Sequence, residues 1–185
     1  MFFLGRLSRC RFDWQEDLLN EEDVYGKNVF PDMGSRNWAA LHIDPDVSYY
    51  QDLGLRDNTI MTILHECAHA FLRIWICDDS KCKTVKCKDV HAMGIGGRGH
   101  GYLWLQLTSH VYAVAHNFLG INTVDAAEDL RDSMYNEWQA TGNVPGWRHV
   151  RGCHWRYRFR VVAFIREYKD RPWVSPRIND EEDAR

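Results

Sequence analysis

The chain has 185 residues, of which 45% are hydrophobic and 26% charged, and its formal net charge is −3. This length and composition predict one folded domain with a sizeable core, and they exclude a wholly disordered or collagen-like chain. The near-neutral charge argues against a protein whose whole surface coats nucleic acid.

The sequence shows no sign of a membrane or secretory segment. No apolar run approaches the roughly 20 residues that a membrane-spanning helix requires. The apolar residues 1–4 are followed at once by Gly5 and Arg6, so this start is too short for a secretory signal. Six cysteines without such a signal favour reduced thiols or metal ligands. We therefore expect an intracellular protein, nuclear or cytoplasmic, with no membrane partner.

The first fifty residues alternate short apolar runs with turn-forming glycine, proline and aspartate. Residues 9–14 and 38–43 are predicted to be strands, and we expect them to form a small antiparallel sheet. With the helices predicted below, the fold class is α+β, a sheet packed on helices. We expect a single domain over residues 1–175, followed by an acidic tail over residues 176–185.

The clearest helix is predicted for residues 58–76. Its apolar residues recur at the helical period and form one continuous stripe. The stripe consists of Ile60, Ile63, Leu64, Cys67, Ala68, Phe71, Leu72 and Trp75. Asp57 or Asn58 is suited to cap the start of the helix. We expect the helix to pack along this stripe, with Cys67 as a core residue rather than a ligand.

Residues 77–98 break the helical pattern and form an insertion rich in Cys, Lys and Gly. Two further helices are predicted after it, at residues 102–118 and 124–140. The apolar side of the first is predicted to be Leu103, Leu107, Val111, Val114 and Phe118. Gly120 is suited to end it. We expect His110 and His116, which fall on different faces of this helix, to be structural or exposed.

The segment 148–171 is strongly basic, with a local net charge of +6. Within it, residues 155–161 alternate aromatic residues with arginine, which predicts a strand with one solvated face. Such a pattern is also suited to contact nucleic-acid phosphates and to stack unpaired bases. A half-buried strand with solvated arginines explains it as well, so nucleic acid is an alternative partner.

Residues 65–69 read H-E-x-x-H inside the clearest predicted helix. Residues four apart project from the same side of a helix, so His65 and His69 are suited to bind one tetrahedral Zn²⁺. Glu66 lies about 100° further round the helix, where its carboxylate reaches a water on the metal. Zinc lowers the pKa of that water toward ~7, and Glu66 accepts its proton as the nucleophile forms.

A catalytic zinc site needs a third protein ligand and an open fourth position. Leu72 and Trp75 stand where the extended metzincin pattern has glycine and histidine, so that class is excluded. Three candidates remain: Glu128, a helix-borne carboxylate like that of the gluzincins; His91, in the Cys-rich insertion; and His100, between two glycines that permit close backbone approach. The spacing alone does not choose among them.

Two stretches of the chain together resemble the SprT-like zinc metalloprotease family. Residues 64–72 read LHECAHAFL and residues 99–104 read GHGYLW. The family pairs a helix reading H-E-x-x-H-A with a later G-H-G and a large aromatic residue near the start of the next helix. Residues 2–7 and 40–45 are similar to further stretches of the family, so the likeness covers roughly residues 2–118.

The resemblance implies a zincin-like architecture with a Cys-rich insertion between the zinc ligands. It implies His65, His69 and His100 as those ligands and Glu66 as the catalytic acid and base. The implied activity is zinc-dependent hydrolysis of peptide bonds in protein or peptide substrates, in family members often proteins crosslinked to DNA. Two alternatives remain: a zinc hydrolase or biosynthetic enzyme that is not a protease, and a DNA-binding module with structural zinc.

Two further groups of residues bear on the chemistry. Cys77, Cys82, Cys87 and His91 offer enough ligands for a second, structural zinc, with disulfides or unliganded thiols as alternatives. Acyl transfer also needs a group that stabilises the tetrahedral oxyanion, and the candidates are Tyr102, Tyr112 and Arg98.

Overall fold

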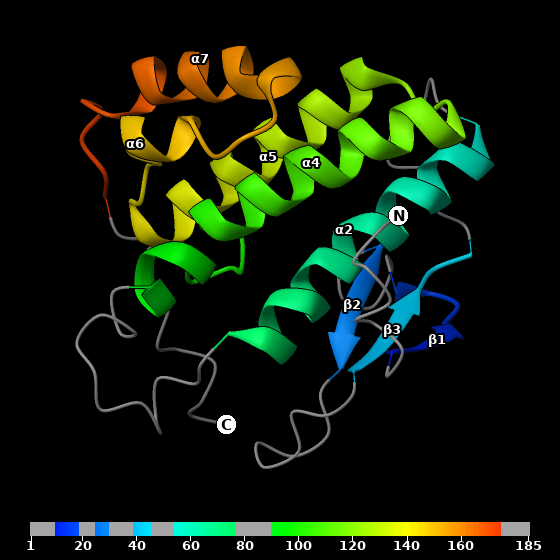
Figure 1. The fold of residues 1–185 in the computed structure, drawn as a ribbon. Helices are drawn as coiled ribbons and strands as arrows, with labels where there is room; N and C mark the ends of the chain where they lie inside the picture. Colours follow the sequence, from blue (N-terminus) through cyan, green and yellow to red (C-terminus); the bar gives the residue numbers. More distant parts are fainter. Residues whose placement is uncertain (1–9, 19–24, 30–38, 46–53, 77–89, 175–185) are drawn as a thin grey trace, which may run out of the picture.

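The computed structural model describes residues 10–18, 25–29, 39–45, 54–76 and 90–174. Within them the fold is α+β, with a small sheet on one side of helix α2 and the remaining helices on its other side (Figure 1). No helix in these ranges combines the length and the hydropathy needed to cross a bilayer. The acidic tail expected over residues 176–185 lies outside the described residues.

The helices stack in sequence order away from the sheet. Helix α2 (Leu55–Trp75) contacts the sheet and α4 (Tyr102–Leu119), α5 (Thr123–Thr141) contacts α4, and α7 (Arg158–Tyr168) contacts α5. Three shorter pieces complete the fold: the π-helix η2 (Val90–Ile95), helix α6 (Trp147–Val150) and the 3₁₀ helix η3 (Trp155–Tyr157).

The sheet has three strands in the order β1-β3-β2 and is mixed, not antiparallel as predicted. The two predicted strands are present as β1 (Cys10–Trp14) and β3 (Ala39–Ile43), and they run parallel. The long connection between them permits a parallel pairing, which no tight hairpin does. The third strand, β2 (Gly26–Val29), pairs antiparallel with β3. It was not predicted because its sequence, GKNV, has no alternation of apolar residues.

Helix α2 separates two hydrophobic clusters. Leu64, Ala68 and Leu72 face the large cluster that α4, α5 and α7 complete, whereas Cys67 and Ala70 face β3. The predicted stripe is therefore buried or half-buried, except at the helix end, where Trp75 is 51% exposed. The helix also begins three residues earlier than predicted, with Gly54 as its N-cap, so the predicted caps lie inside the first turn.

Helix α4 spans the predicted residues, but its buried face was predicted only in part: Val111 is buried and Leu103 and Leu107 pack against the core. Phe118 is 80% exposed, and the fully buried side chains include Trp104, Leu105 and Tyr112. Because α4 contacts α2, α5 and α6, it is covered on more than one side. Its buried residues therefore also include small Thr, Ser and Ala side chains. A single apolar stripe is the wrong expectation for a helix buried in this way. The predicted Gly120 does end it, in the left-handed conformation.

The segment predicted as a strand over residues 155–161 is helical, formed by η3 and the start of α7. The buried residues of η3 and α7 recur at helical spacing. They are Tyr157, Val161, Phe164, Ile165 and Tyr168. The alternation of aromatic residues with arginine was therefore misleading.

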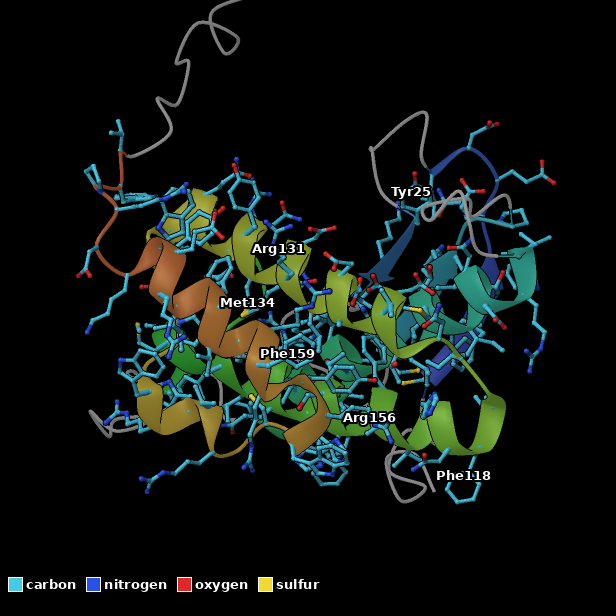
Figure 2. The ribbon with its side chains drawn as sticks, turned by 90° about the horizontal axis from the view of Figure 1, so that it is seen from above. Tyr25, Phe118, Arg131, Met134, Arg156 and Phe159 are labelled. Carbon is cyan, nitrogen blue, oxygen red and sulfur yellow. The ribbon has the colours of Figure 1, made fainter. Side chains whose placement is uncertain are left out.

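Several arginines of the basic segment are used within the fold. Arg158 donates to the carbonyl oxygens of Cys153 and Arg151, and Arg160 pairs with Glu128 at 2.7 Å. Trp155 and Phe159 remain largely exposed. Figure 2 shows Phe159 and Arg156 at the α7 side of the molecule, with Tyr25 near the sheet. Nucleic-acid binding by this surface stays a prediction.

Candidate metal centre

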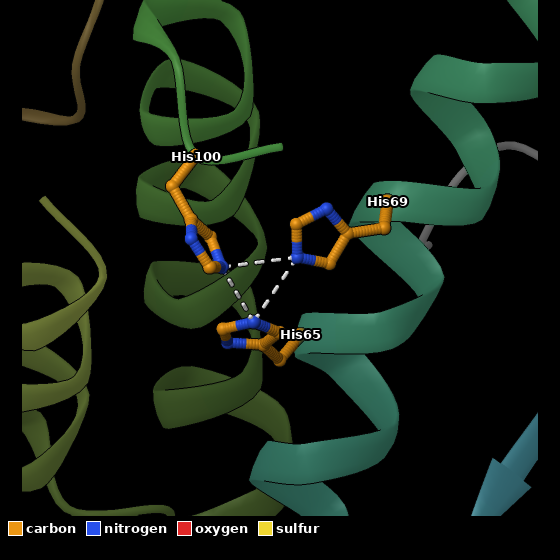
Figure 3. Close-up of side chains that lie close together, drawn as sticks. All are labelled: His65, His69 and His100. Atoms are coloured by element: carbon orange, nitrogen blue, oxygen red, sulfur yellow. Dashed lines mark hydrogen bonds between the residues drawn. The ribbon is translucent and has the colours of Figure 1, made fainter. Parts of the chain in front are cut away.

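Three histidines converge between α2 and the loop that precedes α4. The Nε2 atoms of His65, His69 and His100 lie 3.1 Å from one another in each of the three pairs (Figure 3). In the described part of the chain, no other group of three His, Cys, Asp or Glu side chains is arranged to hold a metal ion. This cluster could hold one.

Local geometry brings the first two histidines together. His65 and His69 are one helical turn apart on α2, so both imidazoles leave the helix on the same side. Their rings are stacked or tilted against Trp104, with ring centroids 4.7 and 5.5 Å away, and His100 also contacts this indole. The fully buried Trp104 therefore forms one wall of the centre.

The third histidine depends on the glycines beside it. Gly99 has a φ of +86°, which favours glycine, and a Cβ there would lie 2.9 Å from Nδ1 of His69. A Cβ on Gly101 would lie 2.5 Å from the carbonyl oxygen of Gly94. Glycine at position 99 therefore lets the loop approach α2, which is the close approach predicted for His100, and glycine at position 101 lets the chain pass against the backbone of η2.

The donor set fits a divalent cation. Tetrahedral ligands held about 2.0–2.1 Å from one Zn²⁺ are about 3.3 Å apart, close to the observed spacing. Burial and the neighbouring histidines hold the pKa of His69 well below its usual value and lower that of His100 to about 3. Both rings are therefore neutral, as metal ligands must be. The ring nitrogens of the three imidazoles point at one place, which suits a shared cation.

Asp129 of α5 holds the ring of His65, and the sequence analysis missed it. Its Oδ2 lies 3.3 Å from Nδ1 of His65 and accepts a hydrogen bond of 2.6 Å from the Tyr112 hydroxyl. Burial alone lowers the pKa of His65, but the carboxylate and its hydrogen bond raise it above the ordinary value. A proton held on Nδ1 leaves Nε2 free for a metal. The adjacent Glu128, a predicted alternative ligand, pairs with Arg160 instead.

Glu66 is buried beside the histidines and is held by Asn28 of β2. The Asn28 amide donates both to the Glu66 carboxylate and to its main-chain oxygen, the latter at 3.0 Å. Burial raises the pKa of Glu66, although His65 and the Asn28 hydrogen bond act in the opposite direction. No sequence signal pointed to Asn28, because it lies in the strand that was not predicted.

A cavity of about 710 Å³ opens onto the centre and reaches all three histidines and Glu66. Its walls come from four parts of the chain: residues 25–28 at β2, one side of α2, the loop 95–100, and one face of α5. The Gly-rich loop before His100 therefore borders the site. The volume is within the usual range for a ligand site.

The three oxyanion candidates have different surroundings. Arg98 lines the cavity. Tyr112 donates its hydroxyl to Asp129, and Tyr102 stacks on His149 with ring centroids 3.9 Å apart, outside this cavity. Of the three, Arg98 is the residue positioned to meet a bound molecule.

The remaining predicted residues lie elsewhere. His110 and His116 contact the carbonyl oxygens of Gly152 and Ile121 in structural roles, as expected. Cys67 is buried in the core, where burial raises its pKa to about 12.

The proposed second zinc site lies largely outside the described residues. Its three cysteines, Cys77, Cys82 and Cys87, fall in the undescribed range 77–89, and the side chain of His91 is not described either. The second zinc stays a prediction.

Comparison of the chain with family models, with curated proteins and with solved structures gave no match. The function of the chain is therefore inferred from the residues of the centre and from the motifs at residues 64–72 and 99–104.

Proposed function

We propose that this chain is a zinc-dependent metallopeptidase, with His65, His69 and His100 as the metal ligands and Glu66 as the catalytic acid and base. One observation carries the proposal. Three half-buried imidazoles direct their nitrogens to one point next to a buried glutamate, at the wall of a large cavity. Three protein ligands with access from a cavity are typical of a catalytic site, whereas a structural site has four protein ligands.

Imidazole ligands suit zinc among the common biological metals. Zinc bound here would act as a Lewis acid that lowers the pKa of water toward ~7 and polarises a carbonyl. The protein residues do the remaining work. His65 presents Nε2 because Asp129 holds its Nδ1. Trp104 excludes water from the far side of the three rings, since it is completely buried against them.

Glu66 moves the proton. Its carboxylate accepts a proton from water while the water oxygen forms a bond to the carbonyl carbon of the substrate. The same carboxyl group then gives the proton to the amide nitrogen as the carbon–nitrogen bond breaks. Asn28 holds the carboxylate in place throughout. The burial that raises the pKa of Glu66 suits a group that must both accept and return a proton.

The resemblance of residues 64–72 and 99–104 to SprT-like proteases supports peptide bonds as the substrate, including those of DNA-associated proteins. A zinc hydrolase that is not a protease would use the same machinery. Cleavage of a peptide library, measured beside a panel of small amides and esters, separates the two activities.

The test of the proposal is Glu66→Gln, with metal analysis and peptide hydrolysis measured on the same preparation. We expect one zinc per centre to remain bound, because Glu66 is not a ligand, and turnover to fall by about 10²- to 10⁴-fold. Glu128→Gln is the matched control, because it makes the same replacement on a carboxylate that pairs with Arg160 away from the centre. Retained turnover in Glu66→Gln would overturn its assigned role, and a metal-free wild type would overturn the whole proposal.

A further inference from the structure

A second acidic residue of α5, Glu137, is enclosed by the backbone of the loop that carries His100. Its side chain is 3% exposed. One carboxylate oxygen accepts the amide of Gly97 at 2.7 Å and the other accepts that of Arg98 at 2.9 Å. A longer contact of 3.4 Å reaches the amide of His100 itself. Main-chain amides of the loop thus surround one buried carboxylate.

Steric contacts show that the loop closes directly on this carboxylate. A Cβ on Gly96, where φ is +87°, would lie 2.6 Å from the carboxylate atoms of Glu137. A Cβ on Gly97 would lie 2.5 Å from the methyl group of Thr141, which is one turn further along α5. The glycines 96 and 97 therefore allow the main chain to lie against Glu137 and Thr141 of α5, just as Gly99 allows it to reach His69 of α2.

The ring of His100 has no comparable support of its own. Within the described residues, its buried Nδ1 has no hydrogen-bond partner, whereas Nδ1 of His65 faces Asp129. Apart from the packing of its ring on Trp104, His100 is therefore oriented through its main chain. Besides Glu137, the main-chain hydrogen bond from Gly101 to Ile95 tightens the loop, but it joins two residues of the same segment. Glu137 is the contact that ties the loop to another element.

We propose that Glu137 is a positioning residue of the metal centre: by binding the amides of residues 97, 98 and 100, it fixes the place at which His100 delivers its nitrogen. This inference rests on the proposed function, because it concerns a ligand of the proposed zinc. Glu137 does not touch the ion or the substrate. It acts through the loop, and a buried carboxylate is maintained at this place because charge-assisted hydrogen bonds offset the cost of its burial.

Glu137→Gln tests the inference. Glutamine has nearly the same shape as glutamate, but only one of its two terminal groups is an acceptor oxygen. The other is an NH₂ group, which is itself a donor and cannot accept a hydrogen bond from a main-chain amide. We expect the variant to fold and to bind Zn²⁺ about 10- to 100-fold more weakly, the usual loss when a group that orients a ligand is removed. Competition with a chromophoric chelator measures the affinity. The visible spectrum of the Co²⁺-loaded protein reports the geometry, and we expect it to change.

One control and a second variant at position 137 make the result interpretable. Glu128→Gln on the same helix is expected to leave both readouts unchanged, since Glu128 pairs with Arg160 instead. Glu137→Asp keeps both acceptor oxygens on a shorter side chain, and we expect a loss smaller than that of Glu137→Gln. Wild-type affinity and spectrum in a folded Glu137→Gln would overturn the inference. Failure of both Glu137 variants to fold would also overturn it, because the carboxylate would then serve the fold as a whole.

A metal-free measurement separates this inference from the proposed function. In chelator-treated protein, we expect the amide protons of Gly97 and Arg98 to exchange with solvent faster in Glu137→Gln than in the wild type. If the wild type binds no metal but this exchange increases, the proposed function fails and the anchoring of the loop stands. If the wild type binds zinc and the exchange and affinity of the variant are unchanged, only the inference about Glu137 fails.

Discussion

The two sides of the proposed metal centre hold their candidate ligands in different ways. On α2, His65 and His69 are a turn apart, and the helix alone directs both rings to one side. On the opposite side, His100 lies in a glycine-rich loop whose course depends on contacts with α2 and α5. The first side is a local property of the sequence, whereas the second exists only in the folded molecule.

Helix α5 supports both sides, by different means. Asp129 contacts the side chain of a ligand, since its carboxylate faces the His65 ring. Glu137, about two turns further along, contacts the main chain beside a ligand. A helix already fixes the main chain of His65, so only the ring needs a partner. The loop needs its main chain fixed first, which explains why the two carboxylates have different targets.

The largest expected effect comes from removing a ligand from each side. We expect His69→Ala and His100→Ala each to weaken zinc binding by more than the roughly 100-fold that a lost orienting contact costs. His100→Ala keeps the paired histidines of α2, whereas His69→Ala leaves two ligands on separate elements. If the helix side is preformed, His100→Ala retains the tighter residual binding. Zinc titration against a competing chelator measures both.

His110→Ala is the matched control for these variants, since His110 lies on α4 and contacts the Gly152 carbonyl outside the centre. Its zinc affinity should equal that of the wild type. Equal residual binding in His69→Ala and His100→Ala, or tighter binding in His69→Ala, would show that the helix side has no advantage.

A smaller effect is expected when the support of the helix side is weakened. Asp129→Asn keeps the shape of the side chain but removes the negative charge that faces Nδ1 of His65. We expect zinc affinity to fall about 10- to 100-fold, with the fold retained. Tyr112→Phe, which removes the 2.6 Å hydrogen bond to the same oxygen, should have a weaker effect because the carboxylate remains. An affinity loss in Tyr112→Phe equal to that in Asp129→Asn would argue against direct support by the carboxylate.

This contrast also explains which parts of the site could be predicted. The pair on α2 followed from spacing alone, because helical geometry fixes the relation between residues four apart. His100 was one of three candidates by spacing, and only the resemblance selected it. Asp129 and Glu137 gave no signal, because their roles depend on how α5 packs against α2 and the loop. An acidic residue on a helix is ordinarily solvated, and nothing in the sequence distinguishes these two from Glu128.

The fold divides along the same line. The helices over residues 102–118 and 124–140 were predicted within a residue or so of their observed ends. Strand β2 and the direction of the pairing between β1 and β3 were missed, because strand pairing is non-local. The strand predicted at 155–161 was wrong because the alternation of aromatic and basic residues is short there. The apolar residues instead follow a helical spacing that continues to Tyr168.

The smallest effect is expected from the glycine that lets the loop side reach the helix side. Alanine at Gly99 adds a methyl group 2.9 Å from Nδ1 of His69, in a conformation with a φ of +86°. A ring pushed from its rotamer costs about 0.5–1.5 kcal/mol, so we expect zinc affinity to fall roughly tenfold. Chelator competition measures the affinity, and denaturant unfolding of the metal-free protein measures the stability.

Gly120→Ala separates contact from strain in that experiment. Gly120 has a φ of +73°, but a Cβ there would meet nothing within 4 Å. Alanine at either position therefore carries a left-handed conformational cost of about 1–2 kcal/mol in the free energy of unfolding, while only Gly99→Ala touches a metal ligand. If Gly120→Ala weakens zinc binding as much as Gly99→Ala does, the loss comes from general destabilisation. If only Gly99→Ala does so, the close approach of the loop to α2 is itself part of how the two sides form one centre.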